Sequence, residues 1–79
     1  MSILSNTCFL VTLPSGNKAV YAVSPQHLNE RPGTTLNERA YMYGQQIAVK
    51  FGDAWHKSED RSEITDVRTI ALLDRCPEA

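Results

Sequence analysis

The side chains best placed to do chemistry gather in the stretch 53–63. His56 stands there among acids, and an imidazole with carboxylates can bind a metal ion. A zinc site usually needs three or four ligands at close spacing, however, and the other histidine, His27, is far away in sequence. We therefore predict no metal site and interpret 57–66 as a solvated, charged loop or turn. Four acids of the stretch 53–63 could instead face a basic partner surface: Asp53, Glu59, Asp60 and Glu63.

Two cysteines, Cys8 and Cys76, are the other reactive side chains, and they stand near opposite ends of the chain. Nucleophilic catalysis needs a low-pKa thiolate beside a base, whereas Cys8 lies on an expected strand and Cys76 in a tail. Buried or idle thiols are the simpler interpretation. A disulfide that joins the two is the alternative, and it would need an oxidising compartment.

Other catalytic signatures are missing from the sequence. There is no Gly-x-Ser-x-Gly elbow and no glycine-rich phosphate loop. The adjacent carboxylates Glu59 and Asp60 stand in a loop, and neighbours in a loop do not define a cleft. We predict a protein without catalytic residues or cofactors, which is not an enzyme.

Length and composition narrow the class further. The 79 residues predict one domain, 1–79, and an apolar content of 42% is enough for a core. A net charge of -1 does not favour direct nucleic-acid binding. No apolar run reaches the length of a membrane span, and the start of the chain lacks the basic and apolar regions of a signal peptide. We expect a cytoplasmic protein.

The first elements that must position these residues form a β-hairpin. Strand formers fill 7–13, and Pro14-Ser15-Gly16-Asn17 has the chemistry of a type I turn with a glycine bulge. The chain then returns as a strand over 18–23. If Leu13 faces Asn17, one face is apolar and should point to the core. That face carries Phe9, Val11, Leu13, Ala19, Tyr21 and Val23.

A helix should begin near Leu36, because Thr35 and Glu38 fit a capping box. Two interpretations of its end remain open. In one, the helix continues to about Phe51. In the other, it stops at Tyr43 with Gly44 as a left-handed cap, and 46–51 form a half-buried strand that places Ile47, Val49 and Phe51 on one face. Both interpretations place Ile47 and Phe51 in the core.

The stretch 67–73 begins with β-branched residues and predicts a final strand, although its apolar spacing also fits a helix. Residues 76–79 read as a tail. The predicted fold is α+β: a small antiparallel sheet, made of the hairpin and one to three later strands, with one helix packed on it.

Clustered aromatic side chains point to protein binding as the remaining function. Tyrosine and tryptophan anchor many interfaces, and exposure of Tyr41, Met42 or Trp55 would mark a binding surface. The expected partner is a larger protein or ribonucleoprotein complex, with a homodimer as an alternative.

Two resemblances accompany this hypothesis. Val49–Trp55 (Val-Lys-Phe-Gly-Asp-Ala-Trp) resembles the strand-turn-strand of SH3-like and Tudor-type barrels, which implies a small nucleic-acid-binding or regulatory barrel as the alternative function. In size, single domain and missing catalytic motifs, the chain is similar to phage-encoded inhibitors such as anti-CRISPR proteins, although no motif matches residue by residue. That similarity implies a phage or mobile-element inhibitor of a bacterial host complex.

Overall fold

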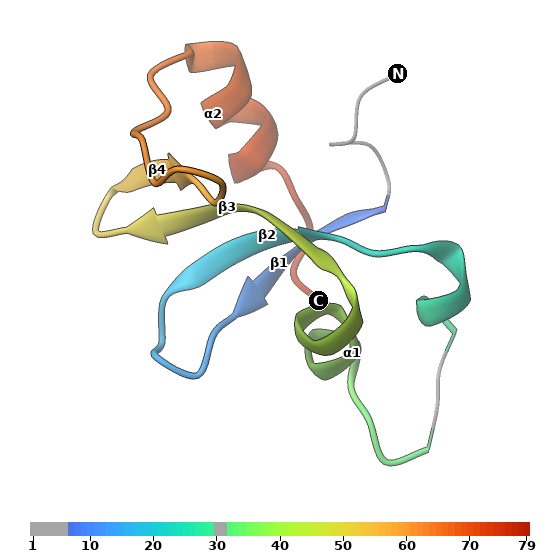
Figure 1. Ribbon diagram of the computed structural model, residues 1–79. Coiled ribbons are helices and arrows are strands. Elements are labelled where there is room, and N and C mark those ends of the chain that lie inside the picture. The colour runs from blue at the N-terminus through green and yellow to red at the C-terminus, as the bar shows by residue number, and fades with distance from the viewer. Residues whose placement is uncertain (1–6, 30–31) are drawn as a thin grey trace.

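The computed structural model describes residues 7–29 and 32–79, and in these ranges an open four-stranded antiparallel sheet lies between two α-helices (Figure 1). The predicted start of the chain, without a signal peptide, lies outside the described residues. The α+β class is confirmed, whereas the barrel implied by Val49–Trp55 is not formed by the described sheet. The strands, paired in chain order, are β1 (Cys8–Thr12), β2 (Lys18–Ala22), β3 (Gln45–Phe51) and β4 (Ala54–Lys57). The helices are the 3₁₀ turn η1 (Pro25–His27), α1 (Leu36–Tyr43) and α2 (Val67–Asp74).

The β1–β2 hairpin has the predicted register. Val11 pairs with Ala19 and Phe9 with Tyr21, while the Leu13 amide donates to the Asn17 carbonyl at 2.8 Å. Gly16 has a φ of 95°, in the left-handed region that glycine enters without steric cost. The turn chemistry of the sequence was therefore sufficient to define this hairpin.

Each face of the sheet supports its own apolar cluster, and each cluster is covered by one helix. Cluster 1, on the α1 side, contains the buried residues Val11, Ala19, Tyr21, Val23, Ala40 and Val49. Cluster 2, on the α2 side, contains Cys8, Val20, Ala48, Trp55 and Leu73. Two thin clusters on opposite faces, rather than one thick core, are what a sheet of this size between two short helices can bury.

Helix α1 ends at Tyr43, so the short interpretation is confirmed and the long helix is wrong. Thr35 and Glu38 form the predicted capping box. Gly44, however, is not left-handed: its φ is -81° and its ψ 172°. Glycine is needed for another reason, because a Cβ at this position would lie 2.6 Å from the Ala40 carbonyl oxygen and 2.9 Å from that of Ala22. The end of α1 thus approaches β2 closely.

Strand β3 departs from simple alternation. The register with β2 shifts between Val20 and Tyr21, which is a β-bulge. Because of the bulge, Val49 belongs to cluster 1 while Ile47 packs against cluster 2, so the prediction that they share a face is wrong. The prediction that Phe51 is core is also wrong. It is 40% exposed, because it stands beside the turn into β4 at the tip of the hairpin.

The predicted final strand is an α-helix. Asp66 caps α2, and its carboxylate accepts a hydrogen bond of 2.9 Å from the Arg68 amide. Leu73 is buried and Ile70 packs beside it, whereas Val67 is 76% exposed. The β-branched residues at its start favoured a strand, but the helical spacing of its apolar residues, which covers cluster 2, decided the outcome.

Returning segments close both outer edges of the sheet. Beside β1, the tail predicted for 76–79 instead pairs in parallel: the Leu10 amide donates to Pro77, and the Ala79 amide to Leu10, at 2.8 and 2.9 Å. Beside β4, the loop returns so that the Ile64 amide donates to the Trp55 carbonyl at 2.8 Å. Covered edges limit strand pairing with other chains.

Candidate protein-binding surface

Three consecutive apolar side chains face solvent at the end of α1. Tyr41, Met42 and Tyr43 are 46%, 63% and 57% exposed. Consecutive helical residues are about 100° apart, so three of them cover more than half of the helix circumference. We call these three residues the α1 patch. Tyr41 and Met42 are exposed, which is the condition under which they were predicted to mark a binding surface. Tyr43 was missed, because its spacing from Leu36 and Ala40 predicts that it lies on the buried apolar face of the helix.

Both tyrosine rings of the α1 patch rest on other aromatic rings. Tyr41 meets Tyr21 edge-on, with ring centroids 6.2 Å apart. Tyr43 stacks on His27 of η1, with centroids 4.8 Å apart and an angle of 10° between the ring planes. Ring contacts of this kind restrict the side-chain rotamers, so less conformational entropy would be lost on binding. His27 was missed by sequence reasoning, because it lies on another element, η1.

Polar side chains fix α1 in place. Arg39, only 3% exposed, donates from Nε to the His27 carbonyl at 3.0 Å and from a terminal nitrogen to the carbonyl and hydroxyl of Thr34 at 3.2 and 3.0 Å. Asn37 makes two hydrogen bonds with the backbone of Thr12, accepting at 2.9 Å and donating at 3.2 Å. These contacts anchor the helix and η1 together, and they leave the α1 patch outside.

Trp55 does not share this surface. It is 4% exposed in cluster 2, and its indole Nε1 donates a 2.9 Å hydrogen bond to an Asp74 carboxylate oxygen on α2. The Lys50 ammonium lies 5.5 Å from the centre of its ring. The exposure on which the prediction for Trp55 depended is therefore absent, because α2, which the sequence led us to expect as a strand, covers it.

The four acids of the predicted partner surface, Asp53, Glu59, Asp60 and Glu63, are all exposed. They lie on the β3–β4 turn and in the loop after β4, and so are not brought together with the α1 patch. Asp60 also has a local structural role: its carboxylate accepts bonds from the amide and hydroxyl of Ser62, at 3.0 and 2.7 Å. These two bonds hold the pKa of Asp60 below its ordinary value, the hydroxyl contributing most.

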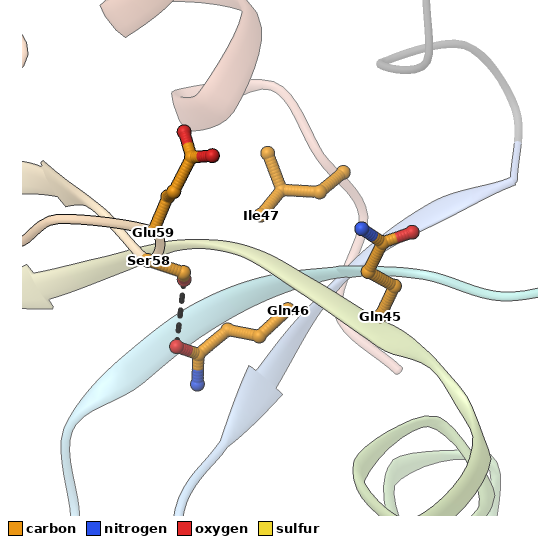
Figure 2. Close-up of a pocket in the computed structure, with 5 residues that line it drawn as sticks. All are labelled: Gln45, Gln46, Ile47, Ser58 and Glu59. Atoms are coloured by element: carbon orange, nitrogen blue, oxygen red, sulfur yellow. Dashed lines mark hydrogen bonds between the residues drawn. The ribbon is translucent and has the colours of Figure 1, made fainter.

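An open hollow of about 450 Å³ lies between the start of β3 and the loop after β4 (Figure 2). The side chains of Gln46 and Ser58 are hydrogen-bonded to each other there: the Ser58 hydroxyl donates to the Gln46 amide oxygen at 2.6 Å. Ile47 and Glu59 point to the α2 side of the strand, away from Gln46 (Figure 2). The remaining lining residue is Gln45, which also lines a second hollow beside Tyr43. The polar lining offers no nucleophile paired with a base.

A smaller exposed group, also missed by sequence reasoning, lies at the tip of the β3–β4 hairpin. The rings of Phe51 and His56 meet edge-on at 5.2 Å, and the Arg61 guanidinium lies 5.8 Å from the centre of the Phe51 ring. One His56 ring nitrogen, Nδ1, is 3.0 Å from the Arg61 carbonyl oxygen. His56 therefore contacts the loop that follows β4. In this loop the backbone of Arg61 is left-handed, with a φ of 65°.

Within the described ranges, no three His, Cys, Asp or Glu side chains are grouped so that they could hold a metal ion. Neither helix described here is long and apolar enough to cross a membrane. Comparison with known proteins finds no match to a family model, a curated protein or a solved structure. Function is therefore inferred from the geometry of the surface.

Proposed function

We propose that this chain is a non-enzymatic protein-binding module that contacts its partner through the α1 patch. The observation that carries the proposal is the exposure of three consecutive apolar side chains, Tyr41, Met42 and Tyr43, on a helix docked by polar contacts. Aromatic side chains and methionine are enriched at the centres of interfaces. Rings already held by Tyr21 and His27 are suited to act as rigid anchors.

The specific form that we propose is an inhibitor, encoded by a phage or mobile element, of a larger bacterial protein or ribonucleoprotein complex. The absence of catalytic motifs from the sequence supports inhibition by occupancy rather than by chemistry. The exposed acids of the loop after β4, including Glu59 and Glu63, would favour a partner whose surface is basic beside the apolar contact.

The test compares two variants in affinity capture from a bacterial lysate. One variant replaces Tyr41, Met42 and Tyr43 with serine, and the matched control replaces Val67 and Leu72, exposed apolar residues of α2, with serine. We expect a stoichiometric partner to be retained by the wild type and the control and lost by the first variant. All five side chains are exposed, so both variants should fold, although the first loses two ring contacts of about 0.5–1.5 kcal/mol each. A cooperative unfolding transition in both variants checks this.

Recovery of no stoichiometric partner would overturn the proposal, and so would equal loss of the partner in both variants. Light scattering of the purified protein would show whether the chain is a monomer or a homodimer. A dimer that dissociates when the α1 patch is changed would show that the patch binds a second copy instead of a host protein. A partner released at high salt would support the contribution of the acidic loop.

A further inference from the structure

The two cysteines, 68 positions apart in sequence, are brought to the same apolar cluster, because the C-terminal segment returns beside β1. Leu10 is bridged to Glu78 through its bonds to Pro77 and Ala79. Cys8 stands two residues before Leu10, and Cys76 two residues before Glu78. The bridge does not extend to the cysteines, because the Cys76 amide donates back to the Leu73 carbonyl at the end of α2, but both cysteines pack at cluster 2. A disulfide requires the two Cα atoms to be about 4.4–6.8 Å apart, a separation that segments joined by a backbone bridge can reach.

The side-chain environment agrees with this placement. Cys8 is fully buried in cluster 2, and Cys76, half-buried, packs against the same cluster. Burial raises the pKa of the Cys8 thiol, and a neighbouring charge on Cys76 raises it further. Burial also raises the pKa of the Cys76 thiol. In the structure neither sulfur is in a disulfide.

We propose that Cys8 and Cys76 are a redox-active pair, whose disulfide fastens the C-terminal segment 76–79 to β1. A small-molecule disulfide is the oxidant. The more accessible Cys76, as thiolate, attacks one sulfur of the oxidant, and the S–S bond of the oxidant breaks. The attacked sulfur stays on Cys76 as a mixed disulfide, and the other half of the oxidant leaves as the first thiol. The Cys8 thiolate then attacks the Cys76 sulfur and displaces the second thiol. Two protein thiols are oxidised, the oxidant is reduced to two small thiols, and the two protons end on these thiols.

When the two cysteines are reduced, weak contacts hold the segment 76–79 on β1, so a disulfide would stabilise its attachment. Two backbone hydrogen bonds join it to Leu10, and an exposed ion pair joins Lys18 to Glu78 at 3.5 Å. Exposed ion pairs of this kind contribute little. A covalent link across a loop of this length constrains the unfolded chain strongly, so oxidation should raise the midpoint of thermal unfolding by roughly 10 °C or more.

The test treats the folded wild-type chain with hydroxyethyl disulfide and maps the products by mass spectrometry of a non-reduced digest. We expect a peptide pair linked through Cys8 and Cys76, a mass lower by two hydrogen atoms, and a raised unfolding midpoint that returns on reduction. The rate should continue to rise with pH above the ordinary thiol range, because burial disfavours both thiolates.

Cys76→Ser is the control, because Cys76 is the less buried of the pair and the variant should fold. It should show no internal link and no rise in the unfolding midpoint under the same treatment. Wild type whose Cys76 has been alkylated serves as a second control. The proposal is overturned if the wild type stops at a mixed disulfide on Cys76, or if it forms only dimers linked between chains. No partner is used, so either result leaves the protein-binding proposal standing.

Discussion

The two α-helices are equal in length, yet they are held on the sheet by different forces. Helix α1 is fixed by Arg39, Asn37 and its capping box, and it buries little besides Ala40. Helix α2 is fixed by apolar contact through Leu73 over Trp55. Polar anchors define position without consuming apolar surface, so α1 can leave its aromatic side chains to solvent. The comparison separates a helix that completes the fold from one that displays a surface.

The largest effect is expected on the α2 side. Leu73→Ala should lower the free energy of unfolding by about 2–5 kcal/mol, because Leu73 is a fully buried side chain of cluster 2. Chemical denaturation would measure this loss in the free energy of unfolding. The control is Leu72→Ala on the same helix, where the side chain is 40% exposed and the loss should be about 1 kcal/mol or less. Equal losses would contradict the apolar docking of α2.

On the α1 side, the corresponding change is Arg39→Ala. It removes the donors to the carbonyls of His27 and Thr34, and we expect a loss of about 2–3 kcal/mol. The His27–Tyr43 stack should loosen as well, which the ring-current shifts of both side chains in NMR spectra would report. Arg68→Ala, at an exposed position of α2, is the control and should change little. Unchanged ring shifts in Arg39→Ala would argue against polar docking.

Gly44 tests how closely α1 approaches the sheet. Gly44→Ala should cost about 1–3 kcal/mol, since the new Cβ meets backbone oxygens of Ala40 and Ala22. Gly44→Asn distinguishes the two explanations of this glycine. Asparagine tolerates a left-handed cap, so it would be accepted if conformation were the reason. We expect it to be as harmful as alanine because the position is extended and crowded.

The link between Trp55 and α2 should contribute a similar free energy. Trp55→Phe removes the indole N–H that donates to Asp74, and we expect a loss of about 1–3 kcal/mol from the hydrogen bond and the smaller ring together. A double-mutant cycle with Asp74→Ala isolates the hydrogen bond. Additive losses would show that only packing joins Trp55 to the helix.

The smallest effect concerns the acidic loop. The pKa of Asp60 is lowered in the folded chain. Its contribution to folding stability is therefore present above the ordinary carboxyl pKa, and it is lost as pH falls through the lower folded pKa. Ser62→Ala should return the pKa of Asp60 toward its ordinary value, as an NMR titration of the carboxyl carbon would show. An unchanged titration would mean that Ser62 does not hold the loop.

Local chemistry determined much of this protein from sequence alone. The Pro14–Asn17 turn defined the hairpin and its register, and the Thr35–Glu38 box defined the start of α1, because each depends on residues close in sequence. Tyr41 and Met42 were predicted to mark a binding surface if they were exposed, and the short helix decided that both are.

Tertiary structure decided the rest. Residues 67–73 had both a strand and a helix pattern, and only the uncovered second face of the sheet, which needed an apolar lid, selected α2. That choice buried Trp55, while the bulge between β2 and β3 separated Ile47 from Val49. The stacking of His27 on Tyr43 and the pairing of the C-terminal segment with β1 join residues distant in the chain. Such contacts depend on how elements pack, and no local propensity encodes them.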